Sequence, residues 1–321
     1  MSNADSIRRE ITEKIVAALE GGQTPMWRQP WLTSKNAGRA ANFISRRPYS
    51  GINVLLLGLH SMQFDHRSRW FGTFEQWKQI GGMVKKRPVN VESGQWGCRI
   101  IFYSPVKKKV ADKETNEQRD DQFFLMRTYT VFNADQVDGE AADKFRVADD
   151  PDAVEEPQFE SADELIAASG ADIRIGGDRA VYHRPVGSFP NHIGGDYIEI
   201  PHRRRFALSG AWYETALHEL AHWSEVRLGW DHDKQGYAAG ELVAELAACM
   251  IASELRIPQG ECLENHAAYL GSWLRAMKAD PRFIFKASSQ ASKVCDYLLS
   301  FRHAEAVIPA DVSVEQVVAI N

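Results

Sequence analysis

The five residues His218-Glu219-Leu220-Ala221-His222 decide how the C-terminal half of the chain is interpreted, and they lie within a run of helical periodicity. Two histidines at positions i and i+4 of a helix lie one turn apart on the same face, so both imidazoles can bind one Zn²⁺ ion. Glu219 is then placed to take a proton from a water molecule that zinc activates. The motif therefore predicts a zinc metallopeptidase site with one ion per chain, in which His218 and His222 are ligands and Glu219 is the catalytic base.

An acidic pair further along the chain supplies candidates for the third ligand. Glu241 and Glu245 are four residues apart in another predicted helix, flanked by small residues that permit close helix packing. A His₂Glu site leaves the fourth position open for water and substrate. The spacing resembles the thermolysin-type, gluzincin pattern, in which the first acid binds metal and the second supports a ligand histidine. This pattern favours Glu241 as ligand and Glu245 as support, but the reverse order stays open.

Other residues near the motif offer weaker alternatives. His232 is a rival third ligand, but the elongated metzincin pattern needs glycine and histidine where this chain has Glu225 and Leu228, so we interpret His232 as a loop residue. The predicted strand Tyr197–Ile200 precedes the active helix, and as an edge strand it can pair with an extended peptide substrate. Residues of a later helix either polarise a substrate oxygen or serve as core and capping residues: Asn265, His266 and Tyr269.

Charge is divided unevenly along the 321 residues, a length that favours two domains. Residues 1–133 hold 21 Lys and Arg against 12 Asp and Glu, a net charge of +9. Residues 134–321 hold the remaining 17 against 31, a net charge of −14. Such a division predicts different partners for the two halves, with a polyanion as the partner of the first.

The hydrophobic pattern predicts an α+β fold in two domains. The first covers residues 5–134, and its expected elements are helices near 7–19, 52–59 and 73–80 and strands 98–103 and 123–132, joined by a lysine-rich loop. Residues 135–160 are acidic and contain Pro151 and Pro157, so we expect a linker or mobile loop there. The second domain covers residues 161–321, and its expected elements are strands 172–175, 180–183 and 197–200 and helices 209–228, 240–255, 262–277 and 284–301.

Several features argue against a membrane or secreted protein. No run reaches the roughly 18–20 apolar residues that a membrane helix needs, and the N-terminus lacks the layout of a signal peptide. The cysteines form no CxxC pair, so we expect neither a disulfide framework nor a cysteine zinc site. The sequence therefore predicts a cytoplasmic protein without a membrane partner.

Cations and aromatic residues alternate in the N-terminal half. Aromatic faces stack on unpaired bases and neighbouring Lys and Arg contact phosphates, which favours single-stranded DNA over closed duplex. The candidate contacts from this pattern are Trp27, Arg28, Trp31, Arg46, Arg47, Tyr49, Trp70, Trp77, Lys78, Lys85 and Lys86.

Both halves carry longer motifs as well. Those of the N-terminal half are Trp27-Arg28-Gln29-Pro30-Trp31, Asn42, Arg47-Pro48-Tyr49-Ser50-Gly51-Ile52-Asn53, Trp70, Thr73, Gln76-Trp77 and Val131-Phe132-Asn133. Those of the C-terminal half are His218 to His222, Glu241-Leu242-Val243-Ala244-Glu245 and His266-Ala267-Ala268-Tyr269 through Trp273. Together they resemble the ArdC-type antirestriction proteins of conjugative plasmids over nearly the whole chain. The resemblance implies an N-terminal domain that binds single-stranded DNA, with Asn53 among its contacts, a C-terminal zincin domain, and shielding of incoming plasmid DNA from host restriction.

The leading hypothesis combines these observations into an antirestriction protein that binds single-stranded DNA and carries a zinc metallopeptidase-like domain. Its expected peptidase substrate is a DNA-associated protein. One alternative is a DNA-coating protein whose zinc site is structural or vestigial. Another is a peptidase unrelated to DNA, whose basic half binds an acidic protein.

Overall fold

The computed structural model describes residues 3–21, 34, 36–111, 118–147, 159–185, 195–230, 234, 236–257 and 264–302. The motif from Trp27 through Arg28 to Trp31 lies outside the described residues, and so does His232. The same holds for residues 148–158 of the predicted linker and for the side chains of Asn265 and His266. No helix among the described residues is long and apolar enough to cross a membrane.

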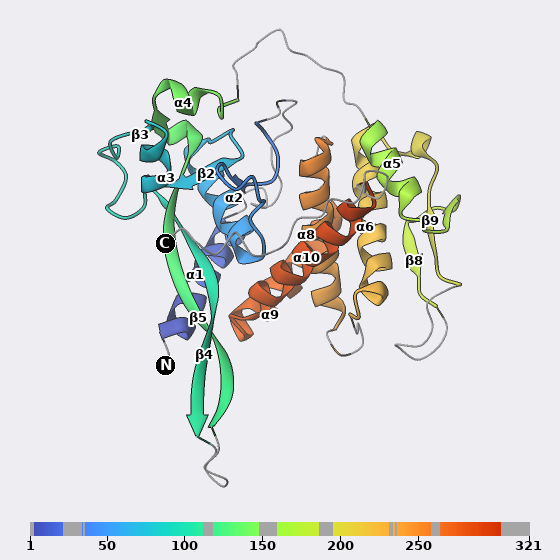
Figure 1. The fold of residues 1–321 in the computed structure, drawn as a ribbon. Coiled ribbons are helices and arrows are strands. Elements are labelled where there is room, and N and C mark those ends of the chain that lie inside the picture. Colours follow the sequence, from blue (N-terminus) through green and yellow to red (C-terminus); the bar gives the residue numbers. More distant parts are fainter. Residues whose placement is uncertain are drawn as a thin grey trace, which may run out of the picture.

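The N-terminal domain packs helices on a four-stranded sheet of order β1-β2-β5-β4 (Figure 1). The first predicted helix is confirmed as α1 (Asn3–Glu20), which buries Ile15 and Leu19. The next two predicted helices are confirmed as α2 (Ile52–Phe64) and α3 (Phe74–Gln79). A capping box between Thr73 and Gln76 satisfies backbone groups at the start of α3. The strands are β1 (Ala41–Asn42), β2 (Trp70–Thr73), β4 (Cys98–Ala111) and β5 (Gln118–Asn133).

Residues 104–111 and 118–122 of the predicted lysine-rich loop belong to the two long strands, so the prediction of a loop over these residues was wrong. Strands β4 and β5 pair in antiparallel register from Cys98 opposite Val131 to Ala111 opposite Gln118, and this pairing includes the backbone of Lys107–Lys109. Inter-strand hydrogen bonds join backbone groups, so a ladder can continue where the side chains become polar. The result is a long hairpin that extends away from the body of the domain (Figure 1).

The first part of the predicted linker is folded. After β5 the chain forms the 3₁₀ helix η1 (Ala134–Gln136), then β6 (Val137–Asp138), which pairs with β3 (Met83–Val84), and then α4 (Glu140–Asp143). Val137, Ala142 and Phe145 are buried in a small core with Phe43 and Trp77. The expectation of a linker over 135–147 was therefore wrong, because a few spaced apolar side chains bury this acidic segment against the first domain.

The C-terminal domain places three strands beside a set of helices. The helices are α5 (Glu160–Ala168), α6 (Ser209–Arg227), α8 (Tyr237–Leu255), α9 (Glu264–Ala279) and α10 (Phe283–Ser300). The strands are β7 (Ile173–Ile175), β8 (Val181–His183) and β9 (Tyr197–Ile200), and the short 3₁₀ helix η2 (Arg203–Arg205) follows them. The α+β fold class and every predicted element of this domain are confirmed. One detail was wrong: β9 is the central strand, paired with β7 on one side and β8 on the other, so it offers no free edge to a substrate.

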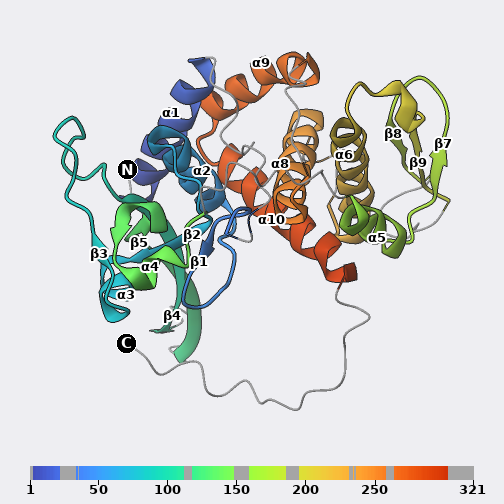
Figure 2. The ribbon, with the colours of Figure 1, turned by 90° about the horizontal axis from the view of Figure 1, so that it is seen from above.

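The two domains pack against each other and share one hydrophobic cluster. Helix α10 contacts α2, and α1 contacts α9, as the view from above shows (Figure 2). The buried Arg39 guanidinium donates to Asp296 of α10 at 2.9 Å and to the backbone oxygen of Tyr49. The Gly51 amide donates to Ser292 Oγ at 2.8 Å. Polar and apolar contacts together therefore hold the domains in one arrangement.

Trp77 belongs to the core of the N-terminal domain and is expected to matter for stability. Its side chain is 0% exposed, stacks on Phe43 at 3.9 Å between ring centroids, and donates to the Phe132 carbonyl oxygen at 3.0 Å. We expect Trp77→Ala to lower the free energy of unfolding by about 3–5 kcal/mol, because it leaves a large cavity. Urea unfolding followed by circular dichroism measures this change.

Phe74→Ala on the same helix is the matched control, because Phe74 is 49% exposed. We expect its effect to stay within about 0.5 kcal/mol. Equal losses in the two variants would contradict the core assignment of Trp77.

Candidate metal centre

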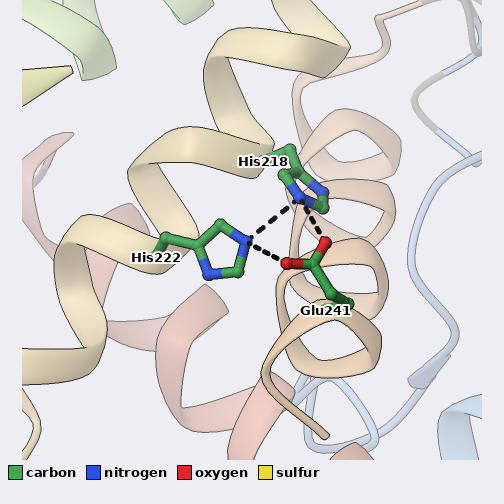
Figure 3. A group of neighbouring side chains, drawn as sticks. All are labelled: His218, His222 and Glu241. Carbon is green, nitrogen blue, oxygen red and sulfur yellow. Dashed lines mark hydrogen bonds and ion pairs between the residues drawn. The ribbon is translucent and has the colours of Figure 1, made fainter. Parts of the chain in front are cut away.

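Helices α6 and α8 pack together and bring three side chains to one point (Figure 3). His218 Nε2 and His222 Nε2 are 3.2 Å apart. Glu241 contributes Oε2 at 3.5 Å from His218 Nε2 and Oε1 at 3.6 Å from His222 Nε2. Two imidazoles and one carboxylate from separate helices therefore converge, and their ligand atoms all lie within 4.8 Å of one another.

The spacing of these atoms fits a tetrahedral divalent metal ion. With metal–ligand distances of about 2.0–2.2 Å, the ligand atoms of a tetrahedral zinc site lie roughly 3.3–3.6 Å apart. The two histidine nitrogens are 3.2 Å apart, and each lies 3.5 or 3.6 Å from a different oxygen of Glu241, which is close to that range. Three protein ligands leave one tetrahedral position open, as in catalytic rather than structural zinc sites.

Glu225 orients one of the histidines, a role that the motif spacing did not predict. Its Oε1 accepts a hydrogen bond from His222 Nδ1 at 2.9 Å, which leaves Nε2 facing the other ligands. Glu225 is 1% exposed and forms an ion pair with Arg184 at 2.8 Å. A carboxylate on the far nitrogen fixes the ring and increases its basicity as a ligand. The signal in the sequence was an acid three residues after the second histidine, on the same helix face.

Electrostatic interactions in the site favour the protonated, positive form of His218 and the ionised, negative form of Glu241. Burial disfavours the charged form of His218, but its hydrogen bond with Glu241 and the nearby carboxylates of Glu219 and Glu245 outweigh burial and raise its pKa. Burial likewise disfavours the Glu241 carboxylate, but hydrogen bonds with His218 and Tyr237 outweigh burial and lower its pKa. The site therefore stabilises positive charge at its centre, and a divalent cation supplies such charge.

The two remaining acids of the motifs lie near the ligands without joining the cluster. Glu219 is 8% exposed and Glu245 is 5% exposed, and both affect the pKa of His218. Glu245 Oε1 accepts a hydrogen bond from Cys249 Sγ at 3.4 Å, one turn further along α8. Among the described residues the metal-ligand group consists of His218, His222 and Glu241, so the arrangement favours Glu241 over Glu245 as the third ligand.

A pair of tyrosines lies beside the carboxylate ligand. Tyr237 Oη and Tyr269 Oη are 2.8 Å apart, and Tyr237 also forms a hydrogen bond with Glu241. The hydrogen bond with Tyr269, partial burial and the Glu241 charge raise the pKa of Tyr237. Tyr269 was among the predicted polarising residues, whereas Tyr237 was not identified. Its signal was its position one turn before Glu241 on the same helix.

The predicted DNA contacts of the N-terminal domain have varied surroundings. Trp77 is buried in the core, so it cannot stack on a base, and that assignment was wrong. The side-chain amide of Asn53 donates to the Ile101 carbonyl oxygen at 2.7 Å and accepts from the Ile101 N–H at 2.8 Å. These two hydrogen bonds hold α2 against β4. Trp70 Nε1 donates to Asn36 Oδ1 at 2.9 Å, and the Arg46 guanidinium lies 4.7 Å from the centroid of the Trp70 ring.

The five remaining candidates differ in how much their side chains are held by the protein. Tyr49 is half-buried, and Lys85 Nζ donates to the carbonyl oxygen of Asp135 at 2.8 Å. The exposed cations are Arg47, Lys78 and Lys86.

Comparison with known proteins identifies the family. A model of the N-terminal domain of the anti-restriction factor ArdC matches residues 5–132, and a zincin-like metallopeptidase model matches residues 160–290. A metal-free crystal structure of antirestriction ArdC from the R388 plasmid is 33% identical, with a TM-score of 0.68 over 92% of this chain and 97% of that one. The chain belongs to the ArdC antirestriction family. The resemblance inferred from the motifs is confirmed.

Three further proteins or structures are similar to this chain. The Mn(II)-bound ArdC structure is 30% identical, with a TM-score of 0.65 over the same shares of the two chains. The uncharacterized protein y4eC of Sinorhizobium fredii is 31% identical over 91% of each chain. A DNA primase TraC of Escherichia coli is 32% identical over 92% of this chain, but the match spans only 20% of TraC. An ArdC-like unit therefore also occurs within much longer proteins.

Metal titration of two variants distinguishes the third ligand. We expect Glu241→Gln to lower Zn²⁺ affinity by more than about 100-fold, because it removes a ligand. Glu245→Gln leaves all three ligands in place, so we expect a smaller loss, of about 10–100-fold at most. Chelator-treated protein titrated with Zn²⁺ against a chromophoric competitor gives both affinities. The opposite order would assign the ligand role to Glu245.

Proposed function

We propose that this chain is an antirestriction protein that binds single-stranded DNA and carries a zinc metallopeptidase site, and that it protects incoming plasmid DNA from host restriction. The observation that carries the proposal is the convergence of His218, His222 and Glu241 in a chain whose two parts match the two ArdC-type models. The solved ArdC is itself a plasmid antirestriction protein, which supports the same role here.

The proposed cofactor is one Zn²⁺ ion per chain, held by His218, His222 and Glu241. Two imidazoles and a carboxylate are a ligand set of catalytic zinc sites. One ArdC structure contains Mn(II), and the same nitrogen and oxygen donors bind both ions. When bound, the ion acts as a Lewis acid and lowers the pKa of its bound water molecule to about 7.

The protein groups around this site have separate tasks in the proposed peptide hydrolysis. Glu219 takes the proton of the attacking water and delivers it to the leaving amine nitrogen. Its low exposure, 8%, limits competing hydration of the carboxylate. The Tyr237 hydroxyl, which bonds Glu241, turns to the substrate carbonyl oxygen and donates a hydrogen bond to it as negative charge develops there. Glu225 and Arg184 keep the His222 ring in the orientation that presents Nε2.

The N-terminal domain is the proposed anchor for DNA. Its sequence carries a net charge of +9, and Arg47, Lys78 and Lys86 are exposed. Such cations bind phosphates at any sequence, which suits a protein that must act on whatever DNA enters. Restriction acts on DNA inside the cell, so the proposed role implies a cytoplasmic location. The proposed peptidase substrate is a protein associated with the same DNA.

Oligonucleotide binding tests the DNA part of the proposal. We expect the protein to bind a fluorescent single-stranded oligonucleotide more tightly than a duplex of equal length, because unpaired bases expose faces for stacking. We expect the affinity to fall steeply as salt rises, because phosphate contacts release counterions. Fluorescence anisotropy across a salt series measures both. No binding at low salt would favour the alternative of a peptidase unrelated to DNA.

Glu219→Gln tests the peptidase part. We expect this variant to retain metal and DNA affinity but to lose at least about 100-fold in the rate of protein cleavage, since it removes the base. The assay incubates DNA-associated candidate proteins with zinc-loaded wild type and variant, with and without single-stranded DNA. Equal cleavage by both proteins would exclude this site. Equal protection of plasmid DNA by both would favour the DNA-coating alternative.

A further inference from the structure

A groove lies between the two domains, and of the residues that were predicted to bind DNA only Asn53 is among those that line it. Its walls come from α1, the start of α2 and strand β4 on one side, and from α10 of the metallopeptidase domain on the other. Its volume is about 1070 Å³, at the upper end of the roughly 300–1,000 Å³ of small-molecule sites. The groove is therefore large enough for more than one nucleotide.

Helix α10 presents a regular polar stripe to this groove. Arg282, just before the helix, and Lys286, Ser289 and Lys293 within it are all exposed and all line the groove. Their spacing of four, three and four residues places them along one helix face. This half of the chain has a net charge of −14, yet it turns three cations towards the groove.

The groove stays basic after internal ion pairs are considered. Arg8 joins the three cations from the opposite wall, and Asp296 is the acid among the groove residues. Arg8 is paired with Asp5 and Arg282 with Asp280, each at 3.0 Å. Asp296 is already paired with Arg39 at 2.9 Å. In the part of the chain that the structure describes, no ion pair involves Lys286 or Lys293. Two lysines without an ion pair, flanked by two arginines along one groove, favour a polyanionic chain as occupant.

Aromatic side chains accompany the cations. Phe102 and Tyr103 of β4 line the groove and are 54% and 40% exposed, although apolar rings are normally buried. Trp230 also lines it, and its Nε1 has no hydrogen-bond partner within the described residues. Exposed rings beside free cations are the combination that binds unpaired bases and their phosphates together. A closed duplex hides its base faces, and an acidic peptide has no bases to stack.

We propose that this groove between the domains holds the single strand, with α10 of the metallopeptidase domain supplying phosphate contacts and β4 of the N-terminal domain supplying stacking rings. The inference rests on the proposed DNA-binding function and deepens it. It makes the strand-binding site a joint property of both domains rather than a property of the N-terminal domain alone.

The test compares two triple variants of the full-length protein with the same change in charge. The groove variant carries Arg282→Gln, Lys286→Gln and Lys293→Gln. The control carries Arg174→Gln, Arg179→Gln and Arg204→Gln, which are exposed residues of the same acidic half and lie outside the groove. Anisotropy with a single-stranded oligonucleotide gives the affinity of each protein across a salt series, and circular dichroism verifies folding.

We expect the groove variant to bind at least about tenfold more weakly than wild type at low salt. We also expect its slope of log affinity against log salt to be shallower by about 2. Each phosphate contact to a single strand contributes about 0.7 to the slope, and the variant loses three cations. The control should match wild type within about twofold. Phe102→Ala should weaken binding by about fivefold or more without changing the slope, because stacking releases no counterions.

The possible outcomes separate the two levels of the proposal. If wild type binds and the groove variant binds equally well, the groove inference is overturned while DNA binding stands. If wild type does not bind at all, the proposed function itself fails. If the triple variant does not fold, Lys286→Gln and Lys293→Gln made singly carry the same test, and wild-type affinity in both would overturn the inference.

Discussion

The close packing of α6 against α8 is the constraint on which the rest of the site depends. These two helices carry four buried acids, Glu219, Glu225, Glu241 and Glu245, which are between 1% and 8% exposed. Buried carboxylates destabilise a fold unless cations or hydrogen bonds compensate them. Arg184 compensates one of them, and the raised pKa of His218 shows that positive charge is favoured at the centre. A divalent ion would complete that compensation, so metal binding and helix packing stabilise each other.

Helix α10 links this centre to the N-terminal domain. It packs against α8, which carries Glu241, and against α2, whose Asn53 holds strand β4 in place. Another face of α10 carries Lys286 and Lys293, which line the groove. Side chains that contact a single strand would therefore lie on an element that also supports the metal helix. The proposed metal centre and the proposed strand-binding groove thus share a structural neighbour, although their residues are far apart in the sequence.

Two of the incorrect predictions have a common origin in burial, and the others depend on strand pairing. An aromatic residue next to a lysine is compatible with both a stacking platform and a core position, and at Trp77 the core position occurs because Phe43 and Phe145 close over the ring. The acidic segment 135–147 looked solvated by composition, yet Val137, Ala142 and Phe145 were enough to bury it. Strand β9 had the expected period, but which strand lies at a sheet edge depends on pairing partners far away in sequence.

The sequence by itself determined the elements that local patterns encode: the helices of the C-terminal domain, the His218 and His222 pair one turn apart, and the family to which the motifs belong. These follow from helical period and motif spacing, which act over a few residues. Tertiary structure alone decided that Glu241 rather than Glu245 meets the histidines, that Glu225 holds His222, and that α10 faces β4 across a groove. Each of these depends on how separate helices are rotated and packed, and packing is set by the whole core rather than by any one segment.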